Sequence, residues 1–256
     1  PPRSTLFPYT TLFRSTAAGT VANAVSGGGR VVKAGSGTLT LAGANSYAGG
    51  TSLSGGVTRV SAPSALGGGA VVLSPGASLV LTASQTVSGT DVARIAGAGT
   101  VLAGTGAEVV WSGDYATGGS VVLDAELGGT LQVGQLTGTG FTKTGPGTLR
   151  VAGTSGYSGA IVVAAGVLDI GSTANLAAGV TVQTAGSGLV QLDTLDGQDL
   201  GKITGTRAVA LKNGASVALD TDALTVTLTT VTNEAWTISG LTGGADLVKT
   251  GAGTLV

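Results

Sequence analysis

The chain has 256 residues, of which 47 are glycine, 42% are hydrophobic and only 10% are charged, and its formal net charge is −1. This apolar content is too high for simple disorder, and the sparse lysine and arginine argue against the basic surface that nucleic-acid binding requires. Because the chain contains no cysteine and no histidine, the composition excludes disulfide scaffolds, cysteine or histidine metal sites and histidine-dependent catalysis.

The N-terminal segment differs from the rest of the chain. Residues 5–15, TLFPYTTLFRS, read as the translation of a short-read DNA sequencing adapter, and Phe7 and Phe13 are two of only three phenylalanines. Segments of this kind are excluded from fold reasoning. We therefore expect residues 1–15 to be a translated artefact that is not native, and residues 16–256 to be the native β-rich unit.

From there on, short β-branched runs alternate with turns rich in Gly, Ser and Asn. No stretch has apolar residues at helical spacing for three turns, and each interior glycine costs a helix about 1 kcal/mol relative to alanine. The pattern predicts an all-β chain. Strands are expected at 71–73, 78–82, 109–111, 120–123, 161–163, 208–211 and 223–231.

A long internal repeat runs through these strands. KAGSGTLTL, starting at Lys33, recurs as KTGPGTLRV, starting at Lys143, and its opening recurs as KTGAGTLV, starting at Lys249. When Lys33 is placed on Lys143, Tyr47 falls on Tyr157, and the correspondence holds without a gap. Such a repeat favours a β-solenoid, a single elongated stack of coils of roughly 20 residues, over a β-sandwich.

The extent of each copy sets the expected domain organisation. Clear repeats cover 25–72 and 136–182, and a truncated copy covers 241–256. Because the last copy stops inside the unit, we expect the chain to be a piece of a longer reading frame.

Two residue types recur with the repeat and are candidates for a binding surface. For the lysines, a stem along the rod with a hydrated ammonium is favoured over a binding stripe. For the tyrosines, a structural role beside a glycine turn is favoured over a sugar-stacking platform. The residues concerned are Lys33, Lys143 and Lys249, and Tyr47, Tyr115 and Tyr157, while Trp111 and Trp236 have no assigned partner.

The densest acidic cluster is LDTLDGQDLG, which contains Asp193, Asp196 and Asp199. A calcium site needs six or more oxygen ligands, and this spacing lacks the known calcium-loop patterns. A solvated turn is therefore favoured over a metal site. The sequence predicts no catalytic residue, no cofactor-binding residue and no metal ligand.

The two long copies resemble the autotransporter-associated β-strand repeat. The shared marks are Lys-x-Gly-x-Gly-Thr-Leu, a Tyr followed by Gly, and a later Gly before an apolar strand, in 33–56 and 143–166. The resemblance implies a right-handed parallel β-helix in the passenger region of a Gram-negative type V secretion protein. It also implies export through a C-terminal outer-membrane barrel in cis, and a location at the cell surface, anchored in the outer membrane or extracellular.

Two functions remain open at this point. The first is a non-catalytic structural or adhesive passenger, a rod that supports secretion and presents binding regions to host-cell, matrix or sister-cell surfaces. The alternative is a carbohydrate-active β-helix enzyme, a pectate-lyase-like polysaccharide lyase or a hydrolase. Glycosidases generally need a carboxylate pair, and the sparse charges and short turns of this sequence favour the rod.

Overall fold

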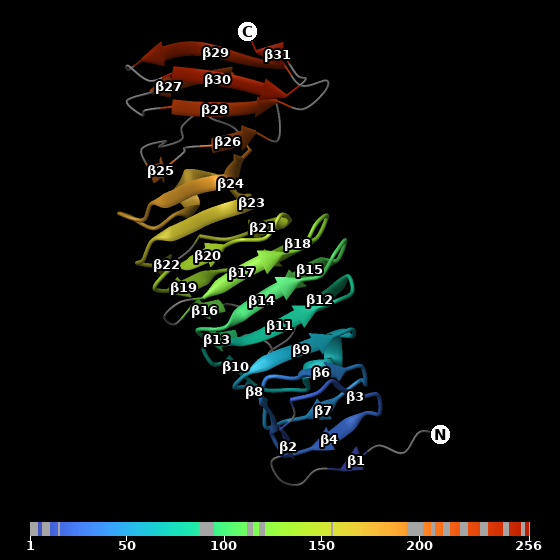
Figure 1. Cartoon of the computed structure of the whole chain (residues 1–256). Coiled ribbons are helices and arrows are strands. Elements are labelled where there is room, and N and C mark those ends of the chain that lie inside the picture. Colours follow the sequence, from blue (N-terminus) through green and yellow to red (C-terminus); the bar gives the residue numbers. More distant parts are fainter. Residues whose placement is uncertain are drawn as a thin grey trace.

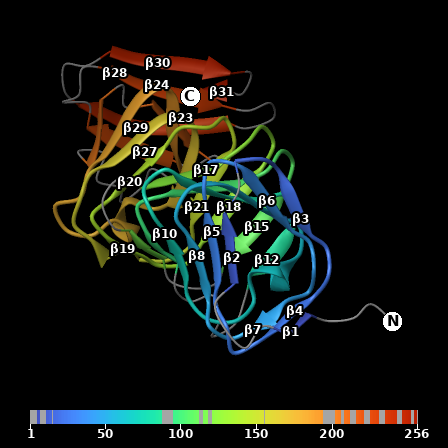
Figure 2. The ribbon, with the colours of Figure 1, turned by 60° about the horizontal axis from the view of Figure 1, so that its bottom comes forward.

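The computed structural model is an elongated, gently twisting stack of parallel β-strands (Figure 1). It describes residues 5–6, 11–14, 16–87, 95–111, 115–117, 121–154, 156–193, 202–205, 208–211, 216–220, 225–230, 235–242, 246–251 and 254–255. The predicted all-β solenoid is confirmed, and each expected strand overlaps an observed one, although the strand expected at 120–123 is observed at Val122–Ala125. Figure 2 shows the strands winding around the long axis of the stack.

Three ladders of parallel strands run along the rod, and consecutive strands of the chain belong to different ladders. The first ladder is an eight-stranded sheet, so eight successive coils contribute one strand each. Its members are β2 (Thr11–Arg14), β5 (Val31–Ala34), β8 (Thr51–Leu53), β10 (Val71–Leu73), β13 (Ile95–Gly97), β16 (Tyr115–Thr117), β19 (Leu136–Gly138) and β22 (Gly156–Tyr157).

The second ladder follows each strand of the first after a short turn. It consists of β3 (Gly19–Val21), β6 (Thr38–Leu41), β9 (Gly56–Val60), β11 (Ala77–Leu81), β14 (Thr100–Ala103), β17 (Val122–Ala125), β20 (Phe141–Lys143), the first halves of β23 (Ile161–Gly171) and β24 (Val182–Leu192), and β25 (Ile203–Gly205).

The third ladder closes the coils from residue 85 onward. It consists of β12 (Gln85–Val87), β15 (Glu108–Trp111), β18 (Thr130–Val133), β21 (Thr148–Val151), the second halves of β23 and β24, β26 (Ala208–Leu211), β28 (Thr225–Thr230) and β30 (Asp246–Gly251).

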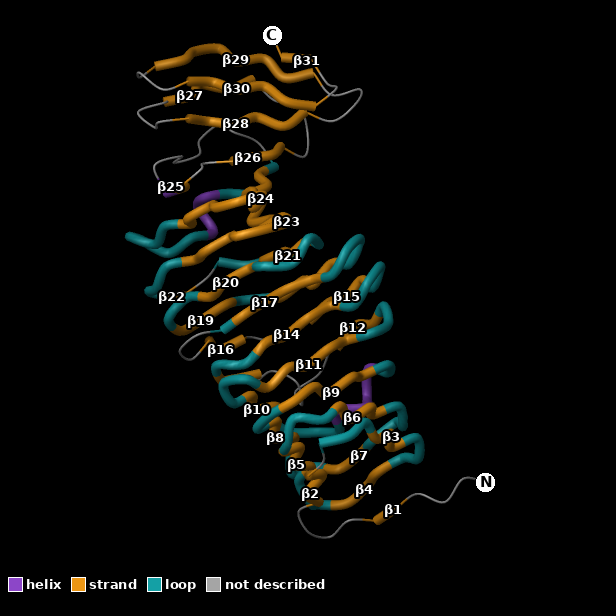
Figure 3. Tube along the Cα trace, in the orientation of Figure 1, coloured by secondary structure: helices purple, strands orange, loops and turns teal. Residues whose placement is uncertain are grey.

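The remaining elements lie at the two ends of the stack and at its corners. β1 (Thr5–Leu6), β4 (Val25–Gly27) and β7 (Ser46–Tyr47) form one small sheet, and β27 (Ser216–Asp220), β29 (Ala235–Thr242) and β31 (Thr254–Leu255) form another series. η1 (Pro63–Leu66) and η2 (Thr173–Asn175) are two short 3₁₀ turns. Figure 3 shows how the turns gather at the corners between strands.

Coil length varies along the rod. In the first ladder, the partners Thr11, Val31, Thr51 and Val71 follow one another at even spacing, but the next step, from Val71 to Ile95, is longer. β1 and β2 pair with β4 and β5, so the described parts of segment 1–15 continue the stack. This placement does not bear on the origin of that segment, which stays a prediction.

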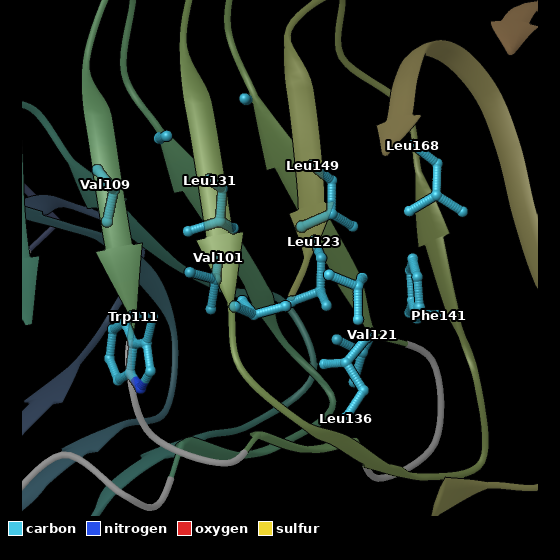
Figure 4. Packing of buried hydrophobic residues seen from close by; sticks show 14 of the residues in the cluster. Val101, Val109, Trp111, Val121, Leu123, Leu131, Leu136, Phe141, Leu149 and Leu168 are labelled. Carbon is cyan, nitrogen blue, oxygen red and sulfur yellow. The ribbon is translucent and has the colours of Figure 1, made fainter. Parts of the chain in front are cut away.

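The core is a set of aliphatic ladders. In the third ladder, Val109, Leu131, Leu149 and Leu168 lie in register, are fully buried and stack on one another (Figure 4). Alternation of buried and partly exposed residues along β18 and β21 places every second side chain inside. Each buried aliphatic side chain contributes about 1.5–3 kcal/mol relative to exposure, which explains how a chain with few aromatic residues sustains a core.

The two long repeat copies begin on different ladders. Five coils lead from Thr38 to Thr142 through successive pairing partners in the second ladder. The repeat equivalent of Thr38 is instead Thr148, which lies one strand further along the chain, on β21 of the third ladder. Each copy therefore spans five coils plus about one strand.

The motif consequently moves to the next face of the rod with each copy. Lys33 lies on β5 of the first ladder, Lys143 on β20 of the second and Lys249 on β30 of the third. The three lysines thus do not form a stripe along one face.

One core position breaks the aliphatic pattern and gives a stability prediction. Thr58 stacks between Leu39 and Leu79, is buried, and among the described residues its Oγ1 has no hydrogen-bond partner. A buried unpaired hydroxyl costs about 1–3 kcal/mol. We expect Thr58→Val, which keeps the shape, to raise the free energy of unfolding by about 1 kcal/mol in urea titrations.

The control is Thr51→Val. The Thr51 hydroxyl donates to the Leu66 carbonyl at 3.0 Å and contacts the Tyr47 hydroxyl at 2.6 Å, so removing it is expected to lower stability. Equal effects of the two substitutions would show that hydrogen bonding at these positions does not matter.

Candidate functional site

The repeat lysines point into the rod. Lys33 is 1% exposed and Lys143 is 0% exposed, so the expectation of a hydrated ammonium is wrong for both. The reason is the alternation along the strand: Lys33 shares the inward face with Val31, and Lys143 shares it with Phe141. The side chain of Lys249 lies outside the described residues.

Backbone carbonyls of two successive coils surround the Lys33 ammonium. Lys33 Nζ donates to Gly35 O at 2.8 Å in its own turn and to Gly55 O at 2.9 Å in the next coil, with Ala34 O at 3.4 Å. The lysine thus bonds turn carbonyls of two coils and links one coil to the next.

The second copy repeats this arrangement and adds a carboxylate. Lys143 Nζ donates to Gly145 O, to Ala165 O at 3.4 Å and to Asp124 Oδ1 at 2.9 Å. Gly145 and Ala165 occupy the repeat positions of Gly35 and Gly55, whereas Asp124 comes from the preceding coil.

The first copy has a different residue at the place of this carboxylate. The repeat equivalent of Asp124 is Arg14, which pairs with Ala34. The carboxylate is therefore particular to the second copy.

The Asp124 carboxylate is held by four donors. Its Oδ1 accepts from Lys143, from the Ala125 N–H at 2.8 Å and from the Gly145 N–H at 2.6 Å, and its Oδ2 accepts from Thr144 Oγ1 at 2.7 Å. Burial acts to raise the pKa of Asp124, but the hydrogen bonds from Lys143 and Thr144, the lysine charge and the Ala125 N–H together hold that pKa below its ordinary value. At the first corner, burial lowers the pKa of Lys33.

The later glycine of the motif is required by this corner. Gly56 and Gly166 have φ of 65° and 69°, a region that favours glycine. A Cβ at Gly56 would lie 2.5 Å from Gly35 O and 2.8 Å from Lys33 Nζ, and one at Gly166 would lie 2.5 Å from Gly147 O and 2.9 Å from Lys143 Nζ. We call the unit of lysine, turn carbonyls and later glycine a lysine corner.

A structural role was predicted for all three tyrosines, and the two that lie in the repeat copies are buried. Tyr47 and Tyr157 are buried at 1% and 2% exposure, and the Tyr157 ring meets Phe141 edge-on with centroids 6.0 Å apart. A Cβ at Gly67 would lie 2.7 Å from the Tyr47 ring, so the absence of a side chain at this glycine makes room for the tyrosine. The side chain of Tyr115 lies outside the described residues.

Tyr47 gives the fold a dependence on alkaline pH. Burial raises the pKa of Tyr47 to about 12 from 10.0, partly offset by its hydrogen bond with Thr51. Because the folded pKa is raised, the associated stability is fully present below pH 10 and is lost as the pH rises towards 12. We expect a loss of about 2–3 kcal/mol across that window. Unfolding titrations of the wild type and Tyr47→Phe would check this, since the variant should lack this part of the loss.

The structure describes two of the other residues singled out in the sequence and leaves the rest outside the described part. Asp193 is exposed at the end of the β24 region, and Trp111 is buried in the core (Figure 4). Asp196, Asp199 and the Trp236 side chain lie outside the described residues. Within the described part of the chain, no group of three or more His, Cys, Asp or Glu is placed to hold a metal ion.

Besides Asp124, three polar residues that bind neighbouring coils together were missed in the sequence. Asn45 accepts from the Val25 N–H at 2.8 Å and donates to Ala65 O at 2.5 Å, which ties three coils together. Arg150 Nε meets Asp169 Oδ2 at 2.8 Å. The only sequence signal for this ion pair is its spacing, since Asp169 follows Arg150 by about one coil.

Two shallow surface depressions occupy related positions in the two copies. One, of about 150 Å³, is lined by Arg30, Ser52 and Val72 among others, and the other, of about 180 Å³, by Gly140 and Val162 among others. Arg30 and Gly140, like Ser52 and Val162, are repeat equivalents. Small-molecule pockets are usually about 300–1,000 Å³, so these depressions are corrugations of the sheet face.

A family model and a curated protein match this chain. The model described as passenger-associated-transport-repeat matches residues 31–60 and 141–170, which each begin at the lysine strand and contain the whole lysine corner. The adhesin BmaC autotransporter of Brucella suis biovar 1 (strain 1330) is 36% identical over 180 residues, which are 69% of this chain and 5% of that protein. The chain thus spans a small part of the length of this relative. No solved structure matches.

Across the described residues, no helix has the length and apolar character needed to cross a membrane. The matched segments coincide with the two lysine corners, and the likeness to an autotransporter extends beyond them over most of the chain. The chain thus carries two segments that match the passenger-associated-transport repeat, and its similarity to an autotransporter supports an autotransporter passenger segment.

Proposed function

We propose that this chain is a non-catalytic segment of an adhesive surface rod, which spaces and presents binding regions outside the cell. The observation that carries the proposal is the lysine corner, because it uses the most distinctive residues of the repeat to join one coil to the next. Buried lysine and aspartate serve cohesion here, and neither is available to a substrate.

Two buried carboxylates also fit this proposal. Asp124 and Asp169 are buried and each is paired with a cation, whereas a glycosidase needs two carboxyl groups facing a sugar. The similarity to a protein named an adhesin supports adhesion as the role. The partners we propose are host-cell, matrix or sister-cell surfaces, and the location is the cell surface or the medium.

The test displays the chain on a bacterium that lacks adhesins of its own, fused to an outer-membrane anchor. We expect the displayed chain to increase attachment to at least one of cultured cells, matrix-coated plates or sister cells, relative to the anchor alone. Unchanged attachment to all three would overturn the adhesive role. In parallel, the purified chain is incubated with polygalacturonate and neutral polysaccharides, and release of unsaturated or reducing ends would instead support the enzyme alternative.

A further inference from the structure

The oxygens of the lysine corner form a cage around one small cation. At the second corner, the Gly145 and Ala165 carbonyls and Asp124 Oδ1 all point at the same nitrogen. At the first corner, the Gly35 and Gly55 carbonyl oxygens lie 2.8 and 2.9 Å from Lys33 Nζ. The oxygens come from different coils, so the cage exists only when neighbouring coils are stacked.

The cage is built by the backbone and not by the lysine alone. The Gly37 and Gly147 carbonyls, which also border the corner, are already bonded by the Val57 and Val167 N–H groups at 3.2 and 3.1 Å. Gly56 and Gly166 carry no Cβ, which would otherwise enter this space. The same backbone path appears in both copies although the surrounding side chains differ, which indicates that the oxygens would stay in place if the lysine were shortened.

We propose that each lysine corner is a monovalent-cation site whose built-in occupant is the lysine ammonium, and that it takes up free ammonium or potassium when that ammonium is removed. Carbonyl oxygens can replace the hydration shell of such ions. The three oxygens that converge on Lys143 Nζ match the three donors of a lysine ammonium, so a monovalent ion of ammonium size is the matching class. The second corner, which adds a carboxylate, is the stronger site.

The experiment measures the melting temperature of the full chain carrying Lys143→Ala in ammonium, potassium or tetramethylammonium chloride at equal ionic strength. Ligands that bind only the folded state raise the melting temperature with concentration. We expect ammonium and potassium to restore several degrees of the loss, while tetramethylammonium, which is too large for the cage, restores none. The wild type, whose cage is already filled by the lysine ammonium, should melt at the same temperature in all three salts at equal ionic strength.

Two further variants keep the result interpretable. Lys33→Ala removes the ammonium from the corner without a carboxylate and should respond in the same order but by fewer degrees. Adding Asp124→Asn to Lys143→Ala should reduce the response to that of Lys33→Ala. Equal melting temperatures in the three salts for both alanine variants would overturn the proposal. Should Lys143→Ala fail to fold in every salt, the Lys33→Ala result decides on the same criterion.

Discussion

Replacing Lys143 by methionine is expected to lower the free energy of unfolding by about 3–5 kcal/mol, because it leaves the buried Asp124 carboxylate without its cation. Methionine has a similar length and fills the same space, so the loss reports charge and hydrogen bonding rather than a cavity. Asp124 retains three other donors, which keeps the loss within this range. Urea titration monitored by circular dichroism at neutral pH measures it.

Two comparisons define the cause of that loss. Lys33→Met removes the same carbonyl contacts where no carboxylate is described and should cost clearly less. The double variant Lys143→Met with Asp124→Asn should lose less than the sum of the single variants, because it leaves no buried charge behind. A Lys143→Met loss no larger than that of Lys33→Met would contradict the role given to the ion pair.

The Lys143–Asp124 pair also predicts how the free energy of unfolding changes at acidic pH. Because the folded pKa of Asp124 is lowered, its contribution is present above the ordinary pKa of an aspartate and is lost as the pH falls through the folded value. In Lys143→Met this contribution is diminished. The difference in free energy of unfolding between the wild type and the variant should therefore become smaller as the pH falls.

Gly56→Ala is expected to cost about 3 kcal/mol or more. A positive φ costs a residue with a Cβ about 1–2 kcal/mol, and the new methyl group would also press on Gly35 O and on the Lys33 ammonium, 2.5 and 2.8 Å from its position. The ammonium would have to leave the Gly35 and Gly55 carbonyls, and the link between the two coils would be lost. Urea titration of the purified variant gives the loss.

Gly76→Ala is the matched control. Gly76 also has a positive φ, of 80°, but nothing lies within 4 Å of a Cβ built there. It should lose only the conformational term, about 1–2 kcal/mol. If the two substitutions cost the same, the crowding inferred at the lysine corner does not exist in solution.

The fold could be predicted largely from local patterns. Alternation of β-branched residues placed the strands, and the repeat indicated stacked coils, because both signals depend on residues near one another in sequence. The movement of the motif from ladder to ladder could not be predicted in the same way. It depends on the sum of five coil lengths, and these vary, as the longer step between Val71 and Ile95 shows.

The lysine corner was only half predictable. The motif and its later glycine stand out in the sequence, yet a hydrated ammonium was expected for Lys33 because lysine is rarely buried. Val31 and Lys33 are two residues apart on one strand, so alternation already placed Lys33 on the inward face. This alternation was a better guide than the general rarity of buried lysine. The partners could not be found, since Gly55 belongs to the next coil and acts through a carbonyl that every residue possesses.

Amine-specific acetylation of the native chain, followed residue by residue by mass spectrometry, tests the buried lysine corner most directly. Lys202, which is partly exposed and donates to Thr173 O and Leu176 O at 3.3 Å, serves as the internal comparison. We predict that Lys33 and Lys143 react far more slowly than Lys202 in the folded chain, and that all three react alike after unfolding in urea. Acetylation of Lys33 and Lys143 in the folded chain as fast as after unfolding would contradict the account.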